Sequence, residues 1–137
     1  MKARELQIGD LLYYKGKFNA FPFKVESITK KKVGYYAEPN DHRMYYLRLS
    51  DCEPILLTPE ILEKNGFKWL LRDSKYITYC IKESTIHVTK YKVTGEWLIC
   101  AGASGSATKR FVEVSCVNYV HELQHALRLY GIKKEIV

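Results

Sequence analysis

Paired cysteines and long apolar runs are both missing from this sequence. Its four cysteines, Cys52, Cys80, Cys100 and Cys116, stand singly, and without a C-x-x-C pair a zinc ribbon is not expected. No apolar run approaches the roughly 18 residues of a membrane-spanning helix, and the N-terminus lacks the pattern of a secretory signal peptide. We therefore expect a cytoplasmic protein with reduced, buried thiols and no contact with a membrane.

Acidic residues are the scarcer of the two charged kinds. The chain has 22 Lys and Arg against 15 Asp and Glu, which gives a net charge of +7. A basic excess favours an anionic partner such as nucleic acid or a nucleotide, and it is equally compatible with a solvated basic surface. Hydrophobic residues make up 47% of the 137 residues, and a chain of this length can bury about two-thirds of its unfolded surface. A core is therefore expected without disulfides, metal or cofactor.

The first 57 residues predict a small antiparallel β-unit. Short strand-like segments lie at 11–14, 21–29, 33–38, 44–49 and 53–57. Each is bounded by residues that favour turns. Turns at intervals of about 8 to 12 residues are typical of a small closed sheet. We expect an N-terminal SH3-like antiparallel β-barrel over residues 1–57.

Residues 58–137 predict two helices around a second β-meander, packed as one compact domain. Thr58 is placed to cap a helix over 59–66, with Pro59 in its first turn and Gly66 at its end. The expected strands lie at 77–81, 85–91, 96–101 and 109–114. The last helix is expected over 118–130, with an apolar stripe formed by Val120, Leu123, Leu127 and Tyr130. The chain as a whole is thus expected to be an α+β protein.

One short motif in the last expected helix is typical of a specific class of enzyme. The segment from His121 through Glu122 to His125 matches the H-E-x-x-H of zinc peptidases, in which a helix turns two imidazoles toward one metal. A catalytic zinc needs a third protein ligand, and the spacing supports neither His42 nor His87 in that role. The two histidines also lie on the side of the helix away from the apolar stripe. We therefore predict a solvated pair that binds no metal and whose His125→Ala variant keeps its stability. A zinc-dependent hydrolase with His121 and His125 as ligands is the alternative.

Tyrosines occur in three adjacent pairs, Tyr13-Tyr14, Tyr35-Tyr36 and Tyr45-Tyr46. Neighbours on a strand point to opposite faces, so each pair should place one ring outward. Outward rings such as Tyr36 and Tyr46 would stack bases, while Lys31 and Lys32 in the nearby turn meet phosphates. Tyrosines that are simply half-buried in a sheet are the alternative.

A loop of small residues over 102–110 is the other candidate for anion binding. Its hydroxyls and cations are Ser104, Ser106, Thr108, Lys109 and Arg110. Bare amides beside such groups can cradle a phosphate, although the spacing of a P-loop is absent. A flexible hairpin loop is the alternative. We expect Lys109 and Arg110 to matter more for a small ligand, and Lys31 and Lys32 more for a polymer.

Three short motifs occur in order along most of the chain. They are Leu6-x-x-Gly9-Asp10 with Tyr14-x-Gly16-Lys17, then Glu53-Pro54-Ile55-x-Leu57-Thr58 through Asn65-Gly66-Phe67, and finally Tyr119-Val120-His121-x-Leu123-Gln124. Together they resemble a family of small uncharacterised proteins encoded by bacteriophages and prophages of the Bacteroides group. The chain departs from that family at Glu122 and His125, where the family has Gln and Asn, which suggests that H-E-x-x-H arose here by two surface substitutions. The resemblance implies a phage or prophage origin, and hence a host cytoplasm, without implying an activity.

These observations predict a non-enzymatic accessory protein that binds an anionic partner. The partner is nucleic acid or a nucleotide signal, and in the second case the protein would sequester a host defence messenger. The prediction rests on charge and on analogy, because no nucleophile–base pair stands out. A zinc hydrolase and a protein–protein interaction module acting on a host protein are the alternatives. A homo-oligomer would offer a shared pocket at its symmetric interface.

Overall fold

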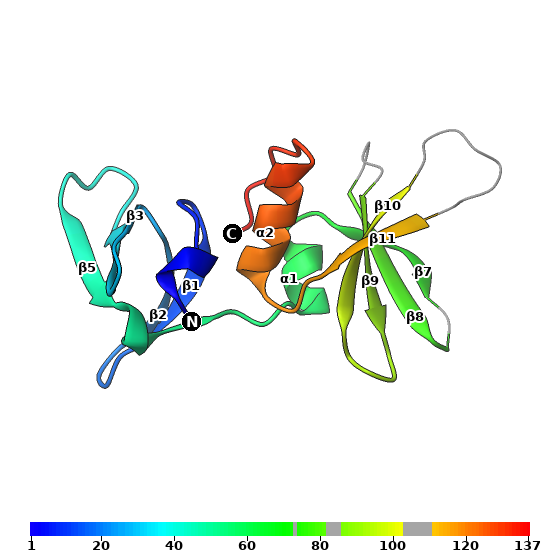
Figure 1. The fold of residues 1–137 in the computed structure, drawn as a ribbon, viewed down its shortest axis with the longest axis horizontal. Helices are drawn as coiled ribbons and strands as arrows, with labels where there is room; N and C mark the ends of the chain where they lie inside the picture. Colours follow the sequence, from blue (N-terminus) through cyan, green and yellow to red (C-terminus); the bar gives the residue numbers. More distant parts are fainter. Residues whose placement is uncertain (73, 82–85, 103–110) are drawn as a thin grey trace. The chain divides into compact units, whose positions relative to one another are not determined.

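A computed structural model of the chain shows an α+β protein with antiparallel sheets and two α-helices. It describes residues 1–72, 74–81, 86–102 and 111–137. The described chain divides into two compact units, residues 1–56 with 119–137 and residues 57–118 (Figure 1). One boundary falls between Leu56 and Leu57, close to the expected position. The C-terminal segment 119–137 was predicted to be part of the second domain but belongs to the first unit.

The first unit contains six short strands in two separate three-stranded sheets. The strands are β1 (Leu11–Lys15), β2 (Ala20–Lys24), β3 (Ser27–Ile28), β4 (Lys32–Tyr36), β5 (Met44–Arg48) and β6 (Cys52–Pro54), with the 3₁₀ turns η1 (Ala3–Glu5) and η2 (Leu49–Asp51). The sheet orders are β2-β1-β6 and β3-β4-β5, and every pairing is antiparallel. In this unit, all of which the structure describes, the strands form no closed barrel, so the expected barrel is not present.

The single strand expected over 21–29 is interrupted at Val25. Its N–H donates to the Asp10 carbonyl at 2.8 Å, and its carbonyl accepts from the Gly9 N–H at 2.7 Å. These bonds attach Val25 to the turn before β1. The chain then enters the other sheet, where Ser27 pairs with Gly34. Apolar and polar residues alternate from Phe23 to Glu26, so periodicity does not reveal the interruption at Val25. The alternation reverses only at Ser27 and Ile28, which already belong to the next strand.

The core of the first unit is small and rich in aromatic rings. Leu12, Val25 and Val33 are fully buried. The rings of Phe21, Phe23 and Tyr35 lie against one another, with centroid separations of 6.3, 5.6 and 5.4 Å. Ring pairs of this kind contribute roughly 0.5–1.5 kcal/mol beyond their area burial. The cluster therefore fixes which face of β4 is turned inward.

The second unit consists of one helix and a five-stranded antiparallel sheet. In helix α1 (Pro59–Lys64) the Thr58 hydroxyl accepts from the Ile61 N–H at 3.3 Å, and Gly66 has a φ of 84° beyond the last turn. Both caps are as predicted. In sheet order the strands are β11 (Phe111–Cys116), β10 (Trp97–Gly102), β9 (Ile86–Tyr91), β8 (Tyr76–Cys80) and β7 (Lys68–Arg72). Strand β7 was not predicted, because a register shift between Trp69 and Leu71 breaks the two-residue alternation there.

Helix α2 (Val120–Leu129) follows the second unit in sequence and belongs to the first. Its first N–H, on Val120, donates to the Ile55 carbonyl at 2.8 Å. Val120, Leu123 and Leu127 are at most 1% exposed, as their spacing predicts. Tyr130 was expected on the same stripe but is 40% exposed, because the helix ends one residue before it. No described helix is long and apolar enough to cross a membrane.

All four cysteines are free thiols, but they differ in burial. Cys52 is buried, and burial raises the pKa of its thiol to about 11. Cys80 and Cys100 are half-buried, and Cys116 at the end of β11 is exposed. The expectation that these last three thiols are buried, drawn from their apolar neighbours in sequence, is therefore wrong for Cys116.

Candidate functional site

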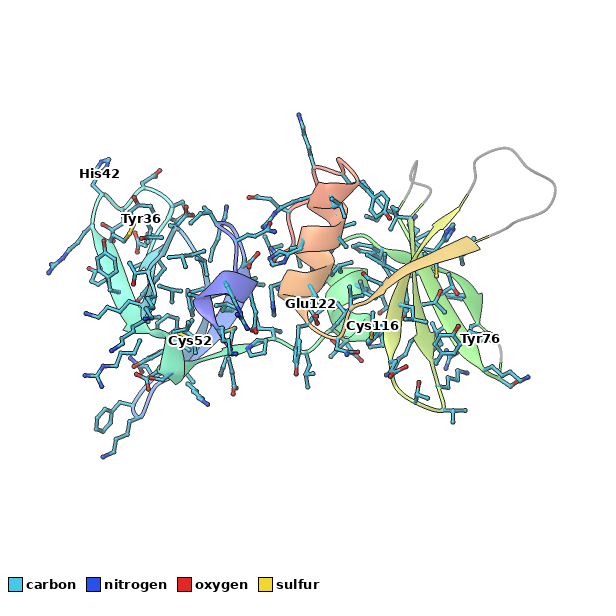
Figure 2. All side chains as sticks on the ribbon, viewed as in Figure 1. Tyr36, His42, Cys52, Tyr76, Cys116 and Glu122 are labelled. Carbon is cyan, nitrogen blue, oxygen red and sulfur yellow. The ribbon has the colours of Figure 1, made fainter. Side chains whose placement is uncertain are left out.

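One face of the β3-β4-β5 sheet combines exposed tyrosines with cations. In the register of β4 and β5, Lys32 lies opposite Arg48, Gly34 opposite Tyr46, and Tyr36 opposite Met44. Alternate residues of a strand share a face, so these residues share one. We call it the β4–β5 outer face, formed by Lys32, Gly34, Tyr36, Met44, Tyr46 and Arg48. Tyr36 (Figure 2) and Tyr46 are 41% and 57% exposed.

The opposite face of the same strands is turned toward the core. Val33 is fully buried there, and the Tyr35 ring lies 5.8 Å from that of Tyr45. Burial raises the pKa of the Tyr35 hydroxyl. The expected division into one inward and one outward ring is therefore seen for Tyr35 and Tyr36. It is less clear in the other pairs, because Tyr45 is itself 38% exposed and Tyr13 and Tyr14 are both half-buried.

Four cations surround a hollow of about 430 Å³ at one end of the outer face. We call this hollow the basic pocket, and its lining includes Lys30, Lys31, Lys32, Arg48, Leu49 and Ser50. Among the described residues none of the four cations has an ion-pair partner, and β3, β4 and β5 contain no Asp or Glu. Unpaired charges of one sign around a concave surface raise the local concentration of anions.

A larger hollow of about 720 Å³ in the first unit is less suited to an anion. It lies between β2 and the C-terminal segment 132–137. Two of its cations are already neutralised, since Lys24 pairs with Glu135 at 2.9 Å and Arg128 pairs with Asp10 at 3.0 Å. Its other two cations, Lys133 and Lys134, share the lining with the acidic Glu26. The basic pocket therefore offers the better anion site, although it is the smaller of the two.

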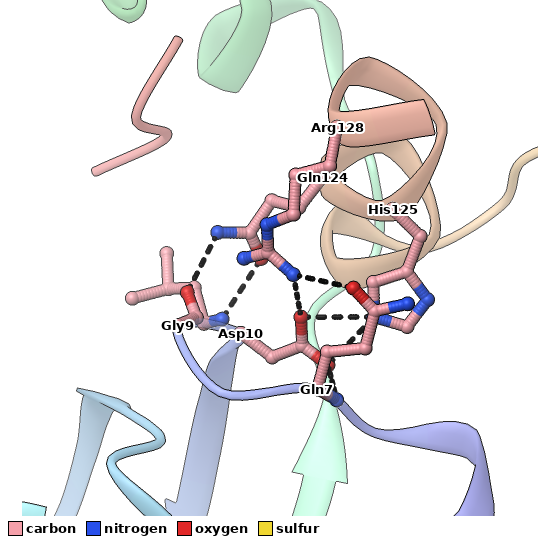
Figure 3. A network of polar contacts seen from close by, with 7 residues as sticks. Gln7, Gly9, Asp10, Gln124, His125 and Arg128 are labelled. Carbon is pink, nitrogen blue, oxygen red and sulfur yellow. Dashed lines mark hydrogen bonds and ion pairs between the residues drawn. The ribbon is translucent and has the colours of Figure 1, made fainter. Parts of the chain in front are cut away.

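A polar network links α2 to the turn before β1 (Figure 3). The Asp10 side chain is fully buried, and His125 Nε2 lies 2.9 and 2.8 Å from its two carboxylate oxygens. Arg128 Nη1 and the Gln7 N–H also donate to this carboxylate, at 3.0 and 2.7 Å. Gln124 accepts from the Leu11 N–H at 2.9 Å and donates to the Gly9 carbonyl at 3.1 Å. Helix α2 is thus held by polar contacts between residues more than 100 positions apart.

The glycine in this turn is favoured by its backbone conformation, and the Arg128 side chain lies close to it. Gly9 has a φ of 92°, in the left-handed region that side chains disfavour. A Cβ atom at this position would also lie 3.0 Å from Arg128 Nη2. The Gly9-Asp10 pair of the N-terminal motif is therefore explained by the docking of α2. In the sequence this role is indicated only weakly, by an acidic residue directly after a turn glycine and before an apolar strand.

The H-E-x-x-H residues are arranged differently from the prediction of a solvated pair. His121 is only 6% exposed, and His125 is engaged with Asp10. Glu122, the third residue of α2, accepts a hydrogen bond at 3.0 Å from the N–H of Tyr119, which is the N-cap residue of the helix. No group of three or more His, Cys, Asp or Glu side chains is arranged to hold a metal in the part of the chain that the structure describes. We now expect His125→Ala to lose stability, in place of the sequence-based expectation of no change, because that variant removes a hydrogen-bond partner of the buried Asp10 carboxylate.

The buried imidazole of His121 leads to a pH prediction. Burial lowers the pKa of His121 and outweighs the opposing effect of the Asp10 carboxylate, so the unfolded chain takes up this proton at a higher pH than the folded one. Stability should therefore be complete above the unfolded pKa of about 6.5 and fall as the pH drops toward the folded pKa. When the pH is lowered from 7.5 to 5, we expect the free energy of unfolding to fall less in His121→Phe than in the unsubstituted protein. Urea denaturation at each pH measures this difference. The exposed His42→Phe is the control, and parallel pH profiles for His121→Phe and the unsubstituted protein would contradict the assignment.

The remaining candidate residues from the sequence fall into two groups, one on the β3-β4-β5 sheet and one outside the described residues. Ser104, Ser106, Thr108, Lys109 and Arg110 lie outside the described residues. Lys31, Lys32, Tyr36 and Tyr46 lie at the outer face or the basic pocket. Arg48 and Lys30 join them there, and the register of β4 with β5 is what brings Arg48 beside Lys32. Sequence alone could not supply that register.

Comparisons with known proteins add no family to this description. No family model, curated protein or solved structure matches the chain. Function is therefore inferred from the chemistry of the chain's own surfaces.

Proposed function

We propose that this chain binds single-stranded nucleic acid across the β4–β5 outer face and does so without catalysis. The observation that carries the proposal is the register of β4 and β5, which gathers Tyr36, Tyr46, Lys32 and Arg48 on one exposed face. Aromatic rings for bases beside cations for phosphates are the two elements that single-strand binding surfaces combine.

The spacing of the rings suits successive bases. Tyr46 and Tyr36 stand on neighbouring strands in adjacent rows of the face, and such diagonal neighbours are about 7–8 Å apart. Each stacked base is worth about 1–3 kcal/mol and needs no particular sequence. Bases in a duplex are already stacked and paired, so exposed ring platforms favour a single strand.

The charges of the face complete the proposed interaction. Lys32 and Arg48 form the row next to Tyr46, and Lys30 and Lys31 lie beside them in the basic pocket. Each phosphate that a cation neutralises releases counterions, so binding should weaken with salt by about 0.7 log units in affinity per phosphate and per log unit of salt. With a phage origin, as the resemblance of the sequence implies, the partner would be a single strand of the phage or of its host.

The polar network around Asp10 does not support a catalytic alternative. Asp10 has no exposed side-chain surface, and its oxygens already accept from Gln7, His125 and Arg128. A substrate could not reach this carboxylate without displacing α2. The cluster is better explained as the attachment of the helix.

Fluorescence anisotropy with a labelled dT10 oligonucleotide tests the proposal. We expect binding that weakens steeply with salt, a loss of about 1–3 kcal/mol in Tyr46→Ala, and a shallower salt slope in Lys31→Ser/Lys32→Ser. Tyr130→Ala, which removes a tyrosine that is also exposed, and Lys64→Ser/Lys92→Ser, which removes two exposed lysines of the second unit, are the matched controls.

Three results would contradict the proposal. No binding to single-stranded DNA or RNA would leave the positive charge as a solvated surface and favour the protein-interaction alternative. Binding of a cyclic nucleotide without binding of dT10 would favour the nucleotide-signal alternative. Equal losses of affinity for dT10 in Tyr46→Ala and Tyr130→Ala would show that the outer face is not the binding surface.

A further inference from the structure

Resting on the proposed function, we infer that the basic pocket binds a terminal phosphate of the strand, so that the protein distinguishes phosphorylated ends from hydroxyl ends. The ligand class is a phosphate monoester at the end of a nucleic acid. An internal phosphate carries one negative charge, whereas a terminal monoester carries about −1.5 to −2 at neutral pH and presents three acceptor oxygens.

The number of cations in the pocket fits the more highly charged group. Lys30, Lys31, Lys32 and Arg48 all line one hollow, and none has an ion-pair partner among the described residues. Arg48 can donate two parallel hydrogen bonds to a phosphate, and the lysines supply point charges. Ser50 adds a hydroxyl to the lining. One internal phosphate, with its single negative charge, would leave most of the positive charge of the pocket without a counter-charge.

The position of the pocket also fits the end of a strand. Lys32 and Arg48 form the last row of the outer face, because β5 ends at Arg48 and η2 begins at Leu49. There the Leu49 N–H donates to the Lys31 carbonyl at 2.8 Å, which joins η2 to the turn before β4. The tyrosines lie only in the other direction along the face, so bases on Tyr46 and Tyr36 would follow a phosphate held in the pocket.

Three dT10 oligonucleotides with fluorescein on an internal base test this inference in anisotropy titrations of the full chain. They carry a 5′-phosphate, a 3′-phosphate or hydroxyls at both ends. We expect one phosphorylated form to bind about tenfold more tightly than the hydroxyl form, since a hydrogen bond to a charged group is typically worth at least that factor. Which end is preferred gives the polarity of the strand on the face.

Two double variants separate the pocket from the face. Lys30→Ser/Lys31→Ser should remove the preference. The hydroxyl form should still bind, more weakly and with a shallower salt slope, because Tyr36, Tyr46, Lys32 and Arg48 remain on the outer face. Tyr36→Ala/Tyr46→Ala should weaken all three oligonucleotides by the same factor and keep the preference. Lys64→Ser/Lys92→Ser, with the same loss of charge, should keep both.

The failures are distinguishable. Equal binding of the three oligonucleotides to the unsubstituted protein overturns this inference and leaves the proposed function intact. A preference that survives in Lys30→Ser/Lys31→Ser overturns the assignment to the basic pocket. Absence of binding by all three overturns the proposed function and this inference with it.

Discussion

An Asp10→Ala variant is expected to lose about 3 kcal/mol of stability in the first unit. Removing one partner of a buried ion pair typically costs about 3–5 kcal/mol. The lower end applies here, because the side chains of His125 and Arg128 are 23% and 36% exposed and can be hydrated after the carboxylate is gone. The loss also includes the acceptor of the Gln7 N–H, 2.7 Å away, and the contact of α2 with the turn before β1.

Hydrogen exchange of peptides from residues 1–56 and 119–137 measures this loss where it should occur. Both tryptophans, Trp69 and Trp97, lie in the second unit, so their fluorescence reports on that unit separately. Asp41→Ala is the matched control, since Asp41 accepts a single hydrogen bond in an exposed turn and should lose about 1 kcal/mol or less.

A double-mutant cycle tests whether Asp10 acts through α2. Asp10→Ala and His125→Ala should be non-additive, with an interaction energy of about 0.5–3 kcal/mol. Additive losses, or an Asp10→Ala variant as stable as Asp41→Ala, would show that the network does not hold the helix.

A Leu123→Asp variant should lose at least as much stability as Asp10→Ala, on the order of several kcal/mol in the free energy of unfolding. Leu123 is fully buried on the apolar side of α2, and an ionised carboxylate placed there without a partner carries a large desolvation penalty. Thermal unfolding followed by circular dichroism should show a clear fall in the melting temperature.

Leu129→Asp is the control on the same helix. Leu129 is 79% exposed, so the same substitution there should cost less than about 1 kcal/mol, most of it from a negative charge near the helix C-terminus. Similar losses at the two positions would mean that the buried side of α2 is wrongly assigned.

Local patterns in the sequence determined most of the secondary structure. Thr58 and Gly66 predicted both ends of α1, because each acts within a few residues of itself. The spacing of Val120, Leu123 and Leu127 predicted the apolar side of α2. The alternation in β4 predicted that Tyr35 and Tyr36 point to opposite faces. The same kind of rule failed at β7, where a register shift removes the alternation.

The arrangement of these elements was decided only by tertiary contacts. The helical periodicity of the sequence places His121 and His125 away from the apolar stripe, and we therefore expected both side chains to be exposed to solvent. In the structure His121 is buried and His125 meets Asp10, 115 residues away in sequence. Lys32 and Arg48 likewise lie opposite each other at the basic pocket only because of the register of β4 with β5. Apolar periodicity indicates which side of a helix or strand is buried. A polar contact between distant residues leaves no periodic pattern in the sequence, because it needs only one donor in one segment and one acceptor in the other.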